Sequence, residues 1–333
     1  AKDDGSVDTA APSITVDVPD VTNDTTPTIT GTTDAPAGSV VTVVITDGEG
    51  NTQTVTTTVN GDGTYSVEVP NALPEGPVTV EATVKDPSGN EGKATDKGEV
   101  DTTAPSISVD APDNSSDNTP TISGKTDAPA GSVVTVVVTG SDGQSQTVTA
   151  TVKADGTYSV DVPNVLPDGS YTAEASVKDP AGNEAAAKDD GSVDTAAAIT
   201  VDAPALTNDN TPTITGTTTD VEEGQVVTVV VTDSQGNTQT VTTTVKADGS
   251  YSVDVPNALP DGNYGVTATV SDKAGNSATA EDKEGNVVDT TAPSISVDAP
   301  DKSSDNTPTI SGKTDAPEGS VVTVVVTGSD GQT

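Results

Sequence analysis

The chain contains no cysteine, histidine, methionine, tryptophan or phenylalanine among its 333 residues. Without cysteine there can be no disulfide or thiol chemistry, and redox reasoning leaves the cellular compartment open. Without histidine or cysteine, a zinc site lacks its usual ligands and a nucleophile lacks its usual base. Five tyrosines are the only aromatic residues, which alone would suggest disorder. The intervening stretches are nevertheless rich in Val, Ile, Thr and Ala in β-like patterns, so we predict an ordered chain with thin, Val-rich cores.

Positive charge is also scarce. Thirteen basic and 52 acidic residues give a net charge of -39, which excludes nucleic acid as a partner. No run of 18 apolar residues exists, so no membrane insertion is expected, and the first residues do not resemble a signal peptide. We interpret the chain as an internal stretch of a soluble region.

One motif recurs along the chain. Asp-Thr-Thr-Ala-Pro, in variant forms, begins at Asp8, Asp101, Asp194 and Asp289, with periods of 93, 93 and 95 residues. A unit of about 90 residues can close its own core, unlike the 20 to 50 residues of a solenoid repeat. The sequence therefore predicts separate domains in tandem. Their predicted bounds are residues 1–7 for the tail of a preceding repeat, 8–100, 101–193 and 194–288 for the first, second and third repeats, and 289–333 for the first half of a fourth.

Each repeat contains short alternating segments separated by turn residues. In the first repeat, Tyr65, Val67 and Val69 share one face of such a segment, as expected of a half-buried strand. Seven short strands with turns every 8 to 12 residues predict an all-β, immunoglobulin-like Greek-key sandwich. The candidate strands of the first repeat are 13–18, 26–32, 40–46, 52–59, 64–69, 78–85 and a last, more polar segment after the turn at 86–90.

Several of these motifs together resemble a known family. Asn208 to Ile214 (NDNTPTI), Asp155 to Tyr158 (DGTY), Leu166 to Tyr171 (LPDGSY) and Asp179 to Asn183 (DPAGN) are similar to the bacterial immunoglobulin-like repeats of giant biofilm adhesins. The resemblance covers essentially the whole chain. It implies export by type I secretion from Gram-negative bacteria, attachment of the parent protein to the outer membrane, stiffening by calcium, and ligand-binding modules elsewhere.

The first repeat and one joint depart from the pattern. Val78 stands where the other repeats have Tyr171 and Tyr264, so the tyrosine-corner hydrogen bond is expected only in the second and third repeats. No proline stands between Ala197 and Ala198, so the joint after Asp194 is one residue shorter and lacks a rigid φ. We predict a different angle between repeats at that joint.

The strand order predicts where acidic side chains gather. Loops after the second, fourth and sixth strands share a pole with the start of the first strand, so in the second repeat Asp101, Asp127, Asp155 and Asp179 should meet at the joint. Carboxylate oxygens suit Ca²⁺, which takes 6 to 8 of them, and we predict calcium at the joints between repeats. The predicted ligands and their equivalents are Asp8, Asp101, Asp194, Asp289, Asp34, Asp127, Asp220, Asp86, Asp179, Asp272, Asp62, Asp155 and Asp248, with Asp20, Asp24, Asp47, Glu75 and Asp117 as secondary candidates.

Turn chemistry is the alternative for most of these residues, because an Asp side chain hydrogen-bonds to the backbone two residues on. For the linker Asp101, which we expect beside no tight turn, the metal interpretation is preferred, since unneutralised charge would repel neighbouring repeats. Residues 113–118 resemble part of an EF-hand loop but lack its glycine and distal glutamate, so we interpret them as a solvated loop.

Two surface patterns have simpler explanations. The outward threonines 52, 54, 56 and 58 follow from β-propensity rather than ice binding. The apolar segment 133–138 is a central strand rather than an amyloid core.

Three functions remain, and none is enzymatic. The preferred one is a structural extender of a cell-surface adhesin, a monomeric rod stiffened by Ca²⁺ and by contacts between neighbouring repeats. The alternatives are direct binding of carbohydrate or protein, and homophilic association between cells. A binding face should carry exposed aromatics or arginine, and Tyr65, Tyr158 and Tyr251 are predicted to point inward.

Overall fold

The computed structural model describes residues 7–333, and every regular element in that range is a β-strand. The predicted tail at residues 1–7 therefore lies, except for Val7, outside the described residues. The chain divides into two units, one ending at Thr195 and the other beginning at Ala196, which are described separately. The prediction of an all-β fold is confirmed.

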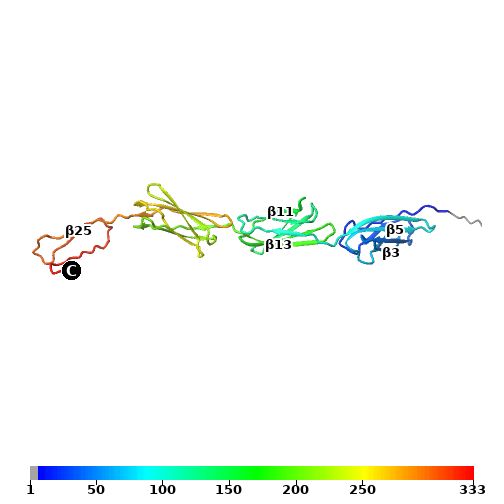
Figure 1. The fold of residues 1–333 in the computed structure, drawn as a ribbon, viewed down its shortest axis with the longest axis horizontal. Coiled ribbons are helices and arrows are strands. Elements are labelled where there is room, and N and C mark those ends of the chain that lie inside the picture. Colours follow the sequence, from blue (N-terminus) through cyan, green and yellow to red (C-terminus); the bar gives the residue numbers. More distant parts are fainter. Residues whose placement is uncertain (1–6) are drawn as a thin grey trace, which may run out of the picture. The chain divides into compact units, whose positions relative to one another are not determined.

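The second repeat shows the complete sandwich, with seven strands. One sheet has the order β11-β8-β7 and the other the order β10-β9-β12-β13, all antiparallel. Figure 1 shows β11 and β13 in the two facing layers. The strands are β7 (Ile107–Asp110), β8 (Thr121–Thr126), β9 (Val133–Thr139), β10 (Ser145–Thr151), β11 (Thr157–Asp161), β12 (Gly169–Lys178) and β13 (Glu184–Val193).

The first repeat has the same arrangement, with a four-stranded sheet β3-β2-β5-β6 and the pair β1-β4. Its predicted first strand at residues 13–18 forms only isolated bridges to β1, at Ile14 and Asp17. Thr22 then forms a parallel bridge to Val100, so this segment joins both sheets. The strands are β1 (Thr28–Thr32), β2 (Val40–Thr46), β3 (Thr52–Thr58), β4 (Thr64–Glu68), β5 (Gly76–Lys85) and β6 (Glu91–Val100).

The second unit contains the third repeat, which forms a four-stranded sheet β18-β17-β21-β22 and two three-stranded sheets, β14-β16-β19 and β15-β23-β20. It is followed by the single pair β24 and β25. The strands are β14 (Ala198–Ile199), β15 (Leu206–Thr207), β16 (Thr213–Thr219), β17 (Val226–Thr232), β18 (Thr238–Thr244), β19 (Ser250–Asp254), β20 (Gly262–Asn263), β21 (Gly265–Ser271), β22 (Ser277–Asp282), β23 (Val287–Val288), β24 (Ile295–Asp298) and β25 (Ser311–Thr314).

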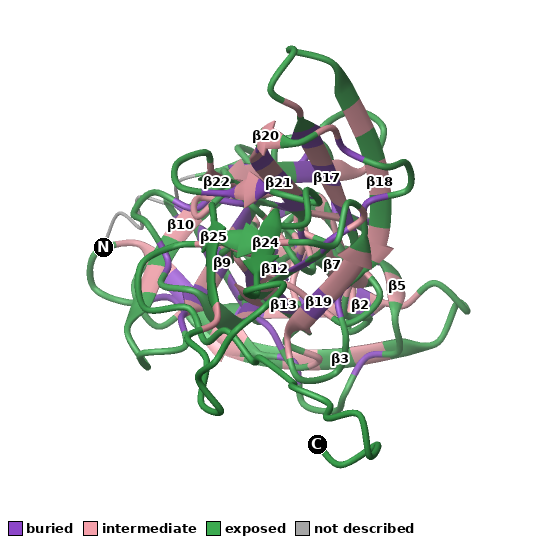
Figure 2. Cartoon of the chain, turned by 90° about the vertical axis from the view of Figure 1, so that its left-hand side faces the viewer, coloured by how far each residue is buried: buried purple, intermediate pink, exposed green. Residues whose placement is uncertain are grey.

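Each complete repeat has its own hydrophobic core, built from the inward positions of both sheets. Figure 2 shows the buried positions inside the sheets and the loops exposed. Tyr158 is 1% exposed and donates a hydrogen bond from its hydroxyl to the carbonyl of Ser108, at 2.6 Å. Burial raises the pKa of Tyr158 to about 12. Tyr65 and Tyr251 occupy the same position, so the prediction that these tyrosines point inward is confirmed.

In the second repeat, a second tyrosine joins β12 to the segment that follows β7. Tyr171 donates to the carbonyl of Pro112 at 3.1 Å, and Tyr264 donates to that of Pro204 at 2.9 Å. Both hydrogen bonds agree with the tyrosine-corner expectation. Val78 is buried at this position in the first repeat, which has no hydroxyl to donate.

The seam between the two sheets is closed by a side-chain amide. The Gln146 side chain donates to the carbonyl of Asn164 at 2.8 Å and accepts from the Asn164 backbone N–H at 2.9 Å. Gln53 with Asn71 and Gln239 with Asn257 repeat this pair. The Gln therefore ties the edge strand β10 to the loop after β11, and its equivalents do the same for β3 and β18.

Candidate functional site at the repeat joint

The joint between the first and second repeats begins where β6 ends. The Asp101 backbone N–H donates to the carbonyl of Thr22 at 2.9 Å, which fixes the start of the linker. The Asp101 carboxylate accepts from the Thr103 backbone N–H at 3.0 Å. Residues 101–106 form no backbone turn, as expected, but the Asp101 carboxylate makes the same kind of side-chain hydrogen bond that Asp makes in turns. Asp8 and Asp289 accept in the same way from the residue two positions on.

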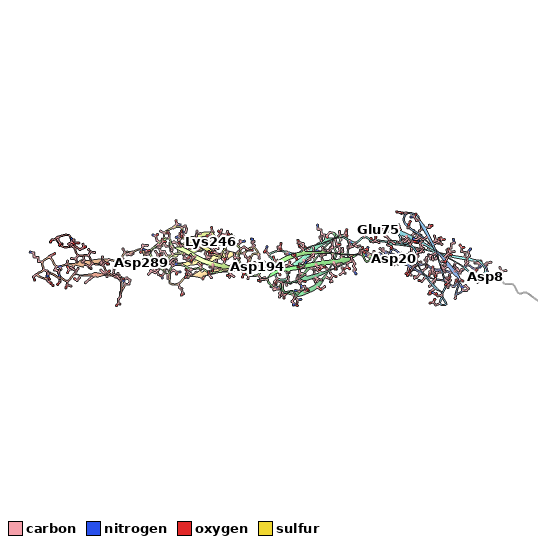
Figure 3. All side chains as sticks on the ribbon, turned by 90° about the horizontal axis from the view of Figure 1, so that it is seen from below. Asp8, Asp20, Glu75, Asp194, Lys246 and Asp289 are labelled. Carbon is pink, nitrogen blue, oxygen red and sulfur yellow. The ribbon has the colours of Figure 1, made fainter. Side chains whose placement is uncertain are left out.

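An acidic side chain of the preceding repeat holds the linker threonines. The Thr102 hydroxyl donates to Glu75 Oε2 at 2.9 Å, and the Thr103 hydroxyl lies 3.0 and 2.8 Å from the two Glu75 oxygens. Figure 3 shows Glu75 and Asp20 at one end of the first repeat and Asp8 at the other. The hydroxyls of Thr103 and Thr102 lower the pKa of Glu75 from its ordinary value of 4.5.

The equivalent carboxylates hold their linkers too. The Thr195 hydroxyl donates to Asp168 at 2.8 Å, within the first unit. In the second unit, Thr290 and Thr291 donate to the two oxygens of Asp261 at 2.7 and 2.8 Å. The position before the glycine in the Leu-Pro-acid-Gly loop therefore has the same role in all three repeats.

The following repeat holds the linker from its other side. The Asn183 side-chain amide donates to the carbonyl of Asp101 at 2.8 Å, and Asn90 donates to the carbonyl of Asp8 at 3.1 Å. A backbone hydrogen bond from Asn23 to the carbonyl of Ala181, at 3.3 Å, joins the two repeats directly. We call Glu75, Thr102, Thr103 and Asn183 the linker clamp.

The linker clamp should respond to acid. Because Glu75 has a lowered pKa, its contribution to the clamp is present above pH 4.5 and is lost as the pH falls through the lowered value. We expect amide exchange of Thr102 and Thr103, corrected for intrinsic rates, to be steady from pH 7 to 5 and to accelerate only as the pH falls below 4.5. A Glu75→Gln variant is the control. If wild type and E75Q showed the same pH profile, Glu75 would not be the titrating group.

The predicted metal ligands meet only in part. Glu99, Asp101, Asp127 and Asp179 line a single hollow at the joint, with a cavity volume of about 460 Å³. Asp155 is not among its lining residues. The sequence thus predicted three of the four acidic residues at this hollow and missed Glu99, which lies in β6 and belongs to no turn motif.

These carboxylates also serve their own turns. Asp127 accepts from the Ser106 backbone N–H at 2.7 Å, and Ser106 lowers the Asp127 pKa. Asp179 accepts with one oxygen from the backbone of Gly182 and Asn183 and with the other from the Asn183 amide. Burial raises the pKa of Asp179, and the stronger combined effect of these hydrogen bonds is to lower it.

Turn hydrogen bonds also engage other predicted ligands. Asp34 accepts from the Ser13 backbone, as Asp127 does from Ser106, and Asp220 has a left-handed φ of 55°. Among residues 7–333, the Asp20 carboxylate accepts none of these turn hydrogen bonds. Asp194 lies beside the boundary between the two units. The remaining acceptors within local turns are Asp24, Asp47, Asp62, Asp86, Asp117, Asp155, Asp248 and Asp272.

The four acidic side chains at the hollow offer carboxylate oxygens, which are the type of ligand that Ca²⁺ binds. As the side chains are arranged, no group of three or more acidic residues within 7–333 is placed to hold a metal ion. Local hydrogen bonds to the backbone account for the present positions of Asp101, Asp127 and Asp179, so the calcium ligands stay a prediction.

Sequence reasoning missed the neutral half of the linker clamp. Asn183 and Asn90 were interpreted only as turn residues, and the linker threonines only as part of a repeated motif. The available signal was the joint recurrence of Asp-Thr, the Leu-Pro-acid-Gly loop and the final Asn of Asp-x-x-Gly-Asn at matching positions. The structure also shows a part-buried Asp in the last strand that pins the first segment, through Asp96 to Val18 and Asp189 to Ala111.

The fold and the repeated joint define a tandem array of immunoglobulin-like sandwiches. The family model for the bacterial Ig-like domain matches residues 4–102, 97–195 and 199–290. The chain belongs to this family.

The solved structures that are similar to the chain include three adhesin regions. The first, a tetra-tandem repeat in the extending region of a large adhesion protein, is 36% identical over 91% of this chain and 81% of its own, with a TM-score of 0.34. A 1.5-MDa bacterial ice-binding adhesin, described for host cell surface retention, is 26% identical over 85% and 100%, with a TM-score of 0.39. A Ca²⁺-stabilized adhesin of an Antarctic bacterium is 28% identical over 88% and 78%, with a TM-score of 0.38.

Comparison with curated protein sequences finds no match. The relationship therefore rests on the family model and on the 36% identity rather than on superposition of whole chains.

Proposed function

We propose that the chain is a structural extender region of a bacterial cell-surface adhesin, which sets the distance between a cell and a binding module. The observation that carries the proposal is the linker clamp, which ties each side of the linker at Asp101 to a different repeat. A spacer needs such joints, because a flexible linker would let its repeats collapse onto one another. The 36% identity to an adhesin extending region supports this role.

The same proposal places the chain outside the cell, in a parent protein held at the bacterial surface and anchored in the outer membrane. The adhesin described for host cell surface retention supports this location. No helix in residues 7–333 has the length and apolar character needed to span a membrane.

The proposal does not include catalysis. The sequence has neither His nor Cys, and its acidic residues are concentrated in turns.

Direct ligand binding is less well supported. All five tyrosines are buried, so none is available to stack on a sugar or to anchor a protein partner. Homophilic association by edge strands is opposed by the Gln–Asn pairs, which tie β3, β10 and β18 to the loop beside them.

Calcium is the second part of the proposal. Asp101, Asp127, Asp179 and Glu99 would hold the ion at the joint, where it would neutralise charge between two acidic repeats. One solved relative is described as Ca²⁺-stabilized. In the low-calcium cytosol the chain would be less stable and easier to secrete.

Small-angle scattering of the chain tests both parts. Deleting residues 101–193 should shorten the maximum dimension by the length of one repeat, about 35 to 45 Å. An unchanged maximum dimension would contradict the spacer role. Replacing the chelator by Ca²⁺ should reduce the flexibility of the wild-type chain but not that of the Asp101→Asn variant. Asp142 lies in a turn away from the hollow, so the Asp142→Asn variant is the control and should behave as wild type. The calcium part is wrong if wild type scatters identically with Ca²⁺ and with chelator.

A further inference from the structure

The turn between β3 and β4 of the first repeat contains a pair of residues that the other complete repeats lack. Asparagine is followed directly by glycine once in the chain, at Asn60 and Gly61. The matching residues are Lys-Ala at 153–154 in the second repeat and again at 246–247 in the third. Whatever chemistry this pair brings is therefore confined to one of the three complete repeats.

The turn itself does not need the pair. The Asn60 backbone N–H donates to the Thr64 carbonyl at 2.8 Å, and the Asn60 carbonyl accepts from the Gly63 N–H at 3.1 Å. Lys153 makes the same two backbone hydrogen bonds in the second repeat, at 2.8 and 3.0 Å. Only the side-chain contact is particular to the first repeat, where the Asn60 amide donates to the Thr64 hydroxyl oxygen at 3.0 Å.

The nitrogen of Gly61 is the unprotected group of this turn. Asn60 and Gly61 are both exposed, and within residues 7–333 the Gly61 N–H donates no hydrogen bond. A Cβ placed on Gly61 would meet nothing within 4 Å, so the space beside this residue is open. Glycine also has no side chain of its own to hinder an approach to its nitrogen. The Asn60 side chain can therefore reach this nitrogen without displacing a neighbour.

We propose that Asn60 is a site of spontaneous deamidation, a modification that accumulates as the protein ages. The Gly61 nitrogen attacks Cγ of the Asn60 side chain, and a new N–C bond closes a succinimide ring. The side-chain amide leaves as ammonia with the proton that the Gly61 nitrogen loses. Water then opens the ring at one of its two carbonyls, which gives aspartate or isoaspartate at position 60. This modification is independent of the extender role.

The neighbouring pair, Asp62 and Gly63, is a less reactive rival. The Asp62 carboxylate accepts from the Thr64 backbone N–H at 3.1 Å and from the Thr64 hydroxyl at 2.7 Å. The Thr64 hydroxyl lowers the pKa of Asp62, so its carboxylate is charged at neutral pH and is a poor target for a nucleophile. The Gly63 N–H is already donated to the Asn60 carbonyl. The reaction should therefore begin at Asn60.

Either product should loosen the turn. Aspartate lacks the amide that donates to Thr64, and it adds a negative charge two residues from Asp62. Isoaspartate in addition inserts a methylene group into the backbone, which spoils the geometry of the hydrogen bonds from Asn60 to Thr64 and from Gly63 to Asn60. We expect the Gly63 amide to lose protection from hydrogen exchange after the reaction.

Incubation of the full chain at neutral pH, followed by peptide mapping with mass spectrometry, tests the proposal. Asn60 should show the mass increase of an amide converted to an acid before Asn71, which is also exposed but precedes an alanine. The modified peptide should separate into aspartate and isoaspartate forms. Gly61→Ala, which crowds no neighbour, should suppress the change at Asn60. The proposal is overturned if Asn60 reacts no faster than Asn71, or as fast in G61A as in wild type.

The second repeat allows the site to be transplanted. Lys153→Asn/Ala154→Gly rebuilds the pair on a turn with the same backbone hydrogen bonds, in which Thr157 is bonded to Asp155 as Thr64 is to its aspartate. Residue 153 should deamidate in the double variant and stay intact in Lys153→Asn alone. An intact side chain at residue 153 in the double variant would equally overturn the proposal.

Hydrogen exchange measures the effect on the turn. The Gly63 amide should exchange faster in aged wild type than in fresh protein, whereas aged Gly61→Ala should match its fresh form. Unchanged exchange at Gly63 in wild type whose residue 60 has been converted would contradict the loosening of the turn.

Discussion

Replacing Tyr158 by alanine should destabilise the second repeat by about 3–5 kcal/mol, the usual cost of truncating a buried aromatic side chain. Tyr158 is among the largest fully buried side chains and packs in the core that spans both sheets. A small domain has a total stability of about 5–15 kcal/mol, so this loss would leave the second repeat marginal. Hydrogen exchange of the full chain in increasing urea should show early loss of protection in residues 107–193, with residues 213–282 unchanged.

Tyr158→Phe separates the ring from the hydroxyl. It keeps the packing and removes only the hydrogen bond to the Ser108 carbonyl, so the expected cost is about 1–2 kcal/mol. If the Ala and Phe variants lost protection at the same urea concentration, the packing of the ring would not be the source of stability.

Gly31→Ala should destabilise the first repeat by about 1–3 kcal/mol or more, through crowding rather than loss of contact. A Cβ at Gly31 would lie 2.2 Å from the Thr15 carbonyl oxygen and 2.4 Å from the Tyr65 hydroxyl oxygen. Neither neighbour can move freely, because Tyr65 donates its hydrogen bond to that same carbonyl. Exchange protection of β1 and β4 should fall first, since Gly31 pairs with Tyr65 between those strands.

Gly61→Ala is the matched control in the same repeat. A Cβ there meets nothing within 4 Å, so the substitution should leave the stability of the first repeat within about 0.5 kcal/mol of wild type. Equal destabilisation by both variants would show that glycine flexibility, and not the contact with Thr15 and Tyr65, decides the effect of G31A.

The strands were largely predictable because alternation with a period of two is a local property. The segment at 40–46 was predicted with its observed bounds, because apolar side chains alternate there and a turn lies at each end. The segment at 13–18 was predicted as a full strand, but it forms isolated bridges because it passes from one sheet to the other.

The joint was predictable in its acidic part only. Strand order correctly brought Asp101, Asp127 and Asp179 to one hollow. It could not show that Glu75 turns to the linker hydroxyls or that Asn183 reaches the Asp101 carbonyl, because those contacts depend on the path of the linker. Asn and Thr are common in loops, so their composition carried no signal of this role.

The most direct test of the account measures how firmly the Asp101 joint is held. The chain has no cysteine, so Thr54→Cys and Thr147→Cys place single spin labels on exposed positions of the first and second repeats. Pulsed electron paramagnetic resonance then gives the distribution of distances between the two labels. In chelator, we predict a narrow distribution of distances for the protein with an intact linker clamp and a clearly broader one for the Glu75→Ala/Asn183→Ala variant. Adding Ca²⁺ should narrow the distribution of the protein with the intact clamp further. Equally broad distributions in chelator for both proteins would contradict the account.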